Sequence, residues 1–171
     1  MARNVEIKAR VYDLEQLHQR IKAIATSEST FISQDDTFFS CTTGRLKLRE
    51  FEDGNGELIF YQRTDSTGPK ESFYVRTPSA DPTSLRQALS LAYGQVGRVE
   101  KQRTLYLAGR PRIHVDSVEG LGDLVELEVV LSESESVEAG VHEARQIVTS
   151  LGIAESDLLE GVYLDLFAAK R

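Results

Sequence analysis

Acidic and basic side chains alternate with apolar ones along several short segments of this chain. Near the N-terminus, Glu6, Lys8 and Arg10 alternate with valine, isoleucine and alanine, and the same spacing recurs over 45–49, 112–116 and 125–129. Because successive side chains of a strand point to opposite faces of a sheet, each segment would present one apolar face and one ionisable face. The spacing therefore predicts strands with a charged side.

The charges on these faces are sorted by sign. Segment 45–49 carries only bases on its polar face, whereas segment 125–129 carries only acids. Alternation alone also fits an ordinary sheet whose charged face meets water. Separate basic and acidic strands fit better with a site in which bases bind a polyanion and acids bind its metal ion.

Composition bounds the protein class. A chain of 171 residues with 40% hydrophobic content can bury one good core, so we expect a single domain over 1–171. It has no run of about 18 apolar residues, and its opening lacks the apolar stretch of a secretory signal, so we expect a cytoplasmic protein with no membrane partner. The net charge of −7 argues against a nucleic-acid partner and favours a small anionic ligand in a basic pocket.

Turn and cap residues divide the chain into strands and helices. Asp13 caps one expected helix, Asp81 and Pro82 open a second that ends near Gly94, and two more follow at about 137–151 and 156–169. The loop 65–69 joins two of the strands. The expected strands are 3–11, 31–40, 45–52, 57–63, 71–77, 96–107, 110–118 and 123–131.

Eight strands joined mainly by short turns predict a largely antiparallel sheet. If such a sheet closes on itself, no edge stays exposed, helices can cover the apolar outer face, and the charged face lines the interior. We therefore expect an α+β fold: an eight-stranded closed β-barrel over about 3–131 with a charged tunnel, and C-terminal helices over about 137–169 packed outside. Buried charges need partners, so acids, bases and a bound ligand with its ion must balance one another.

The order of these charged segments resembles the CYTH domain proteins, also called triphosphate tunnel metalloenzymes. Their hallmark is a strand reading Glu-x-Glu-x-Lys near the N-terminus, which Asn4, Glu6 and Lys8 match at the second and third positions. The resemblance covers 3–131, is closest to the branch that includes the class IV adenylyl cyclases, and extends to the ending 161–166. The later matching segments are Arg45-Leu46-Lys47-Leu48-Arg49, Lys101-Gln102-Arg103, Arg112-Ile113-His114-Val115-Asp116 and Glu126-Leu127-Glu128.

This resemblance implies a tunnel in which bases bind a triphosphate and carboxylates hold Mg²⁺ or Mn²⁺, which take oxygen ligands. It implies catalytic roles for Glu6, Lys8 and Arg49. The expected phosphate-binding residues are Lys8, Arg45, Lys47, Arg49, Lys70, Lys101, Arg103 and Arg112. The expected metal ligands are Glu6, Asp116, Glu126 and Glu128. For Lys47 and Arg103 the alternative is a structural ion pair with these carboxylates.

Some positions stay open between two roles. Lys70, Arg63 and Arg76 fit phosphate binding or solvent exposure equally well. His114 shares a face with Arg112, and we expect it to be a hydrogen-bonded interior histidine rather than a residue that tunes the site.

Asn4 stands where the family motif has its first glutamate. It keeps an oxygen donor but loses a negative charge, so the resemblance implies weaker binding of a second metal ion and a need for high Mg²⁺ or for Mn²⁺.

The first functional hypothesis is a metal-dependent triphosphatase that releases orthophosphate from tripolyphosphate, a nucleoside triphosphate or thiamine triphosphate. The second is a class IV adenylyl cyclase that makes cyclic AMP and pyrophosphate from ATP. The third is a module that binds polyphosphate or nucleotide without turnover. The chain lacks the Gly-x-x-x-x-Gly-Lys-Ser/Thr loop of P-loop proteins, and a homodimer is left open.

Overall fold

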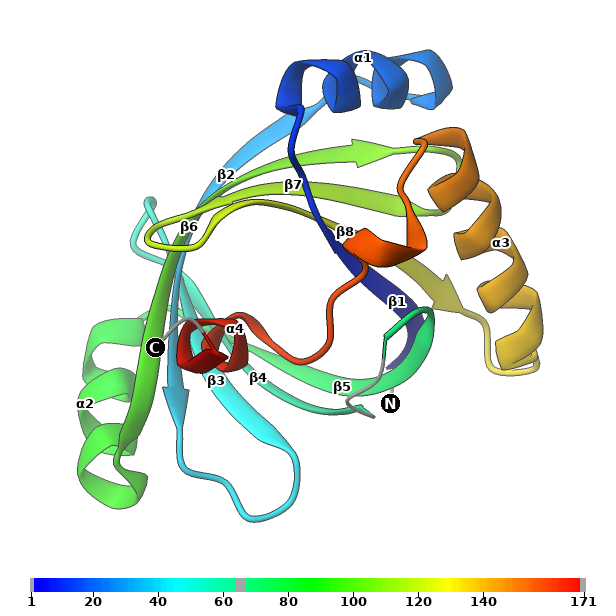
Figure 1. The fold of residues 1–171 in the computed structure, drawn as a ribbon. Helices are drawn as coiled ribbons and strands as arrows, with labels where there is room; N and C mark the ends of the chain where they lie inside the picture. The colour runs from blue at the N-terminus through cyan, green and yellow to red at the C-terminus, as the bar shows by residue number, and fades with distance from the viewer. Residues whose placement is uncertain (1, 64–66, 170–171) are drawn as a thin grey trace.

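A closed antiparallel β-barrel forms the centre of the computed structural model, which describes residues 2–63 and 67–169. The strands follow one another around the barrel in the order β1-β5-β4-β3-β2-β6-β7-β8 (Figure 1). The expected closed barrel is confirmed. Its strands are β1 (Ala2–Arg10), β2 (Thr30–Phe39), β3 (Arg45–Phe51), β4 (Gly56–Arg63), β5 (Lys70–Ser79), β6 (Gln95–Leu107), β7 (Arg112–Val118) and β8 (Gly122–Leu131).

Helices lie outside the ring of strands, and α4 lies at one end of it (Figure 1). The side chains of Asp13 and Asp81 accept hydrogen bonds from the backbone N–H groups of Gln16 and Ser84, so both predicted caps are confirmed. The helices are α1 (Leu14–Ile24), α2 (Pro82–Tyr93), α3 (Val137–Ser150) and α4 (Tyr163–Ala169), with a 3₁₀ turn, η1 (Glu155–Asp157), between α3 and α4. No helix within 2–63 and 67–169 is both long enough and apolar enough to cross a membrane.

The hydrophobic core lies between the outer face of the barrel and the helices. Ile7, Ile113 and Leu127 point outward from β1, β7 and β8 and pack with Ile21 of α1 and Val148 of α3. These side chains are at most 8% exposed. Because their apolar faces turn outward to the helices, the charged faces of the same strands turn inward.

The helix predicted over 156–169 is wrong in its first half. Leu158 pairs with Ala9 as an isolated β-bridge, and the backbone N–H of Leu159 donates to the carbonyl of Lys8 at 2.9 Å. Gly161 then turns the chain at φ +73° before α4 begins. Pairing with β1 thus replaces helical hydrogen bonds in this segment. Asp65 and Ser66 of the predicted loop lie outside the described residues, as do positions 1, 64 and 170–171.

Candidate active site

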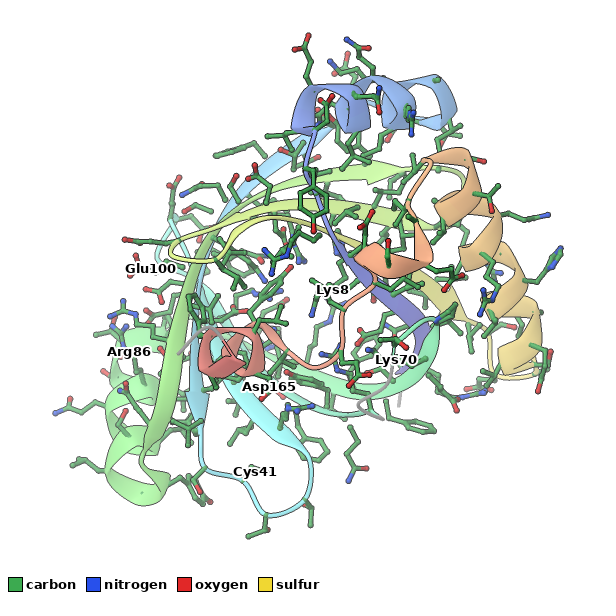
Figure 2. All side chains as sticks on the ribbon, in the orientation of Figure 1. Lys8, Cys41, Lys70, Arg86, Glu100 and Asp165 are labelled. Carbon is green, nitrogen blue, oxygen red and sulfur yellow. The ribbon has the colours of Figure 1, made fainter. Side chains whose placement is uncertain are left out.

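The barrel encloses a charged cavity of about 280 Å³ whose lining comes from all eight strands. Inward-pointing acids and bases from distant parts of the sequence meet there. Figure 2 shows Lys8 inside the ring of strands, whereas Arg86 and Glu100 lie outside it. The predicted charged interior is therefore confirmed.

Three carboxylates, Glu6 of β1 and Glu126 and Glu128 of β8, form what we call the acidic row. Glu6 stands opposite Glu128 in the β1–β8 register, and Lys8 stands opposite Glu126. The ammonium of Lys8 is 3.4 Å from Glu126 Oε2, and the guanidinium of Arg63 donates to Glu6. Glu126 and Glu6 thus each contact a cation that also lines the cavity.

Asn4 and Glu128 lie at one end of the acidic row. Asn4 Nδ2 donates to Glu128 Oε1 at 2.7 Å, while the buried Asn4 Oδ1 has no hydrogen-bond partner among the described residues. Arg112 and His114 approach Glu128 Oε2 only to 3.9 and 4.0 Å. Glu128 is therefore less tightly held by cations than Glu6.

His114 lies between two acids of the row. Its Nδ1 is 3.6 Å from Glu126 Oε1, just beyond hydrogen-bonding distance. Burial and the charge of Arg103 lower the pKa of His114, so the ring is neutral at neutral pH. The predicted interior location of His114 is confirmed, but its ring lies farther from Glu126 than a hydrogen bond allows.

Four cations on β3 and β6, namely Lys47, Arg49, Lys101 and Arg103, form what we call the basic wall. In the strand order, β3 lies across the ring from β1 and β8. Lys47, Arg49 and Lys101 all contact the carboxylate of Asp36 on β2. Arg103 instead forms a bidentate pair with Asp116, at 2.6 and 2.7 Å.

Asp116 is fully buried beneath the cavity lining. Besides Arg103, it accepts a hydrogen bond from the hydroxyl of Tyr163. Arg103 outweighs the effect of burial and holds the pKa of Asp116 below its usual range. The ion pair with a carboxylate that was the alternative for Arg103 is present, although Arg103 also lines the cavity. Asp116 itself does not line the cavity, unlike the three acids of the acidic row.

The remaining expected phosphate-binding residues lie at the margins. Arg45 is at the end of the barrel beside α4 and pairs with Asp165 at 3.0 Å.

The other two expected phosphate-binding residues lie near the acidic row. Lys70 is buried opposite Glu6 in the β1–β5 register. Arg112 lines the cavity near Glu128. Arg76 also lines the cavity but belongs to an exposed stretch of β5.

Burial and mutual charge set the protonation of the site. Burial alone would raise the pKa of Glu126, but Lys8, His114 and Arg103 hold it well below its usual range. Burial and the neighbouring charge of Arg49 lower the pKa of Lys47 to about 8. Glu126 therefore keeps its charge at neutral pH, while Lys47 of the basic wall titrates just above neutral pH.

Three residues of the site escaped the sequence analysis or were left open there: Asp36, Arg63 and Tyr163. Asp36 lies on the inward face of β2, directly opposite Arg49 in the β2–β3 register. The Arg63 side chain is 3% exposed, which resolves the open choice in favour of the interior. Tyr163 lies in the segment 161–166, where a resemblance was noted without a role. Alternation along β2 and β4 is the signal that could have marked Asp36 and Arg63 as inward, but their partners depend on strand register.

The oxygen atoms around Asn4 are suitable ligands for a hard divalent cation. Asn4 Oδ1, Glu6 and Glu128 offer only oxygen atoms from neighbouring positions of β1 and β8, and Asn4 Oδ1 is a buried acceptor without a donor among the described residues. Within 2–63 and 67–169, no three His, Cys, Asp or Glu side chains form a preassembled metal cluster. Since Arg63 contacts Glu6, a cation would have to compete with this contact or arrive as phosphate draws Arg63 away.

Residues 2–163 match the CYTH domain. A curated protein of Methanocaldococcus jannaschii, named "Putative adenylate cyclase MJ0240", is 25% identical over 170 residues, covering 95% of this chain and 97% of that protein. The match over nearly the whole chain agrees with the order of motifs read from the sequence.

Solved structures share the same fold. The PH1012 protein of Pyrococcus horikoshii superposes with a TM-score of 0.85 at 22% identity, covering 95% of this chain and 98% of that one. HpAC1 of Hippeastrum, described as a "putative adenylyl cyclase" that reveals a dominant triphosphatase activity, has a TM-score of 0.66 at 13% identity, covering 100% of this chain and 97% of that one. At these identities the likeness concerns the barrel and its helices.

Proposed function

The chain belongs to the CYTH domain family, and we propose that it is a divalent-metal-dependent triphosphatase that releases orthophosphate from tripolyphosphate or an organic triphosphate. One observation carries the proposal: the basic wall and the acidic row face the same cavity inside the barrel. Bases alone would suit any anion. Bases together with oxygen ligands suit a phosphate chain that arrives with its metal ion.

The internal ion pairs favour joint binding of substrate and metal ion. Lys8 and Arg63 contact Glu126 and Glu6 in the described structure. A phosphate that attracts these two cations releases the carboxylates for Mg²⁺ or Mn²⁺, and the metal ion in turn offsets the phosphate charge. Each ligand should therefore bind more tightly in the presence of the other.

The chain's own residues orient the phosphates and stabilise charge during transfer. Arg49 and Lys8 enter the cavity from opposite walls and can bind non-bridging oxygens of the same phosphate chain. Glu6 and Glu128, with Asn4 Oδ1, would hold the metal ion, which supplies charge neutralisation and orients the attacking water when bound. The ring of strands surrounds the cavity on its sides, which limits water around the reacting phosphate and so strengthens these interactions.

A second candidate is adenylyl cyclase activity, in which the ribose hydroxyl attacks the α-phosphorus of ATP and pyrophosphate leaves. The name of the M. jannaschii relative favours it. The dominant triphosphatase activity of HpAC1 favours the hydrolase. The same wall and row serve either reaction, because both break a phosphoanhydride bond of a metal-bound triphosphate.

Phosphorus NMR separates these reactions. The purified protein is incubated with tripolyphosphate, ATP and thiamine triphosphate, each with Mg²⁺ and then with Mn²⁺. Release of orthophosphate supports the triphosphatase and ranks its substrates, whereas cyclic AMP and pyrophosphate from ATP identify the cyclase. Binding shifts without products would contradict both and leave a triphosphate-binding module.

A further inference from the structure

Asp36 lies at the centre of the basic wall and is 1% exposed. Its carboxylate accepts two hydrogen bonds from Arg49 at 2.7 Å and one from Lys47 Nζ at 3.0 Å, and it lies 3.5 Å from Lys101 Nζ. The three cations come from β3 and β6, the two strands that flank β2. One carboxylate therefore links cations on both of its neighbouring strands.

The basic wall depends on such an anion for its charge. Like charges in a buried site repel one another, and lysines respond by releasing a proton. Burial and Arg49 already lower the pKa of Lys47 to about 8, against the pull of Asp36. Burial and Arg103 hold the pKa of Lys101 well below its usual range, again against Asp36. Without Asp36, both lysines would lose protons at a lower pH.

Other groups around the two lysines do not replace Asp36. Lys47 faces Arg49 on its own strand, the ring of Tyr61 on β4 at 5.6 Å and, more distantly, Glu126 on β8. Lys101 faces Arg103 on its own strand, with Asp116 of β7 bound to Arg103 and the ring of Tyr163 at 4.9 Å. Among the carboxylates that the structure describes, only that of Asp36 lies within ion-pair distance of either lysine.

We propose that Asp36 is a positioning residue of the triphosphate site, whose carboxylate keeps Lys47, Arg49 and Lys101 charged and aligned for the substrate phosphates. This inference rests on the proposed function. One negative charge among three positive ones leaves the cluster positive, so phosphate is still attracted. Asp36 acts through these cations and makes no contact with substrate itself.

The test compares Asp36→Asn with Asp35→Asn, its neighbour on the outward face of β2, which pairs with Arg98. Tripolyphosphate affinity is measured by titration calorimetry from about pH 6 to about pH 9. We expect Asp36→Asn to weaken binding by about tenfold or more near pH 8, with the deficit shrinking toward pH 6 as the lysines regain protons. Asp35→Asn should follow the wild-type protein at every pH.

A second measurement needs no substrate. NMR of the lysine side chains in the ligand-free protein reports the pKa of Lys47 and Lys101, and Asp36→Asn should lower both. If Asp36→Asn does not fold, Asp36→Glu takes its place, because it keeps the charge but shifts its position. Asp36→Glu should bind tripolyphosphate more weakly than the wild-type protein by a similar factor at every pH. A difference in affinity that vanishes toward pH 6 would contradict the proposal that Asp36 aligns the cations.

The outcomes separate the two proposals. Equal tripolyphosphate affinity of Asp36→Asn and the wild-type protein, or unchanged lysine pKa values, overturns the role of Asp36 while the proposed function stands. A wild-type protein that binds no tripolyphosphate at any pH, with or without Mg²⁺, overturns the proposed function and the role of Asp36 at the substrate with it.

Discussion

Asn4 donates a hydrogen bond to Glu128 at 2.7 Å, and its own buried carbonyl oxygen meets no donor among the described residues. The Asn4 side chain thus positions Glu128, a candidate metal ligand, and offers its own oxygen atom as a second ligand beside it. An amide at this position supplies a ligand atom without the negative charge of the family's glutamate, so a metal ion gains less from it.

Replacing Asn4 by glutamate should strengthen metal binding. We expect Asn4→Glu to lower the half-saturating Mg²⁺ or Mn²⁺ concentration by about tenfold in the presence of tripolyphosphate, because one more carboxylate faces the cation. Asn4→Gln is the matched control, since it has the size of glutamate but no charge. Equal metal dependence of Asn4→Glu and Asn4→Gln would contradict the placement of a metal ion beside Asn4.

Replacing Glu126 by glutamine separates an enzyme from a binding module. Glu126 contacts Lys8 at 3.4 Å and Arg103 at 3.6 Å and carries its charge at neutral pH. Loss of that charge should lower the turnover number by about a hundredfold or more, measured as phosphate release. Glu133→Gln, in the exposed connection after β8, serves as the control. A variant with altered affinity but unchanged turnover would argue against catalysis at the acidic row.

Replacing Arg63 by methionine should move two affinities in opposite directions. Arg63 contacts Glu6 and donates to the carbonyl of Gly161 at 2.5 Å. Its removal frees Glu6 for a cation, so Mn²⁺ affinity without substrate should rise several-fold, whereas tripolyphosphate affinity should fall by about tenfold. Calorimetry measures both values, and Arg98→Met on the outer face is the control. If both affinities fall together, Arg63 and the metal ion do not compete for Glu6.

The stability of the protein should fall steeply in acid. Buried cations hold the pKa values of Asp36, Asp116 and Glu126 below those of the unfolded chain. The unfolded state therefore takes up protons first as the pH drops. The stability from these groups is fully present above about pH 5 and is lost as the pH falls below about 4.

Urea unfolding at a series of pH values checks this prediction. The midpoint should drop between about pH 5 and about pH 3, and Asp116→Asn should lower the midpoint near neutral pH while reducing the acid-dependent drop. Removing one partner of a buried ion pair typically costs about 3–5 kcal/mol, so this variant should be much less stable at neutral pH. A midpoint that stays constant down to pH 3 would show that these carboxylates are not stabilised by their partners.

Strand alternation carried most of the fold prediction. Val5 and Ile7 are buried outside the barrel wall, while Glu6 and Lys8 line its interior, as the period of two requires. Turn and cap residues such as Asp13 and Asp81 placed the first helices correctly. The segment before α4 was misread because Leu158 pairs with Ala9, a partner far away in sequence.

The sequence by itself determined the two-faced strands and which of their charged side chains point inward, because these follow from local spacing. The tertiary structure alone decided which charges meet: Asp36 with three cations, Arg63 with Glu6, and Asp116 with Arg103 beneath the cavity lining. Such pairs depend on strand register and on closure of the barrel, which bring together residues as far apart as Glu6 and Arg63. Local patterns can mark a residue as inward-facing, but only closure of the sheet gives it a partner.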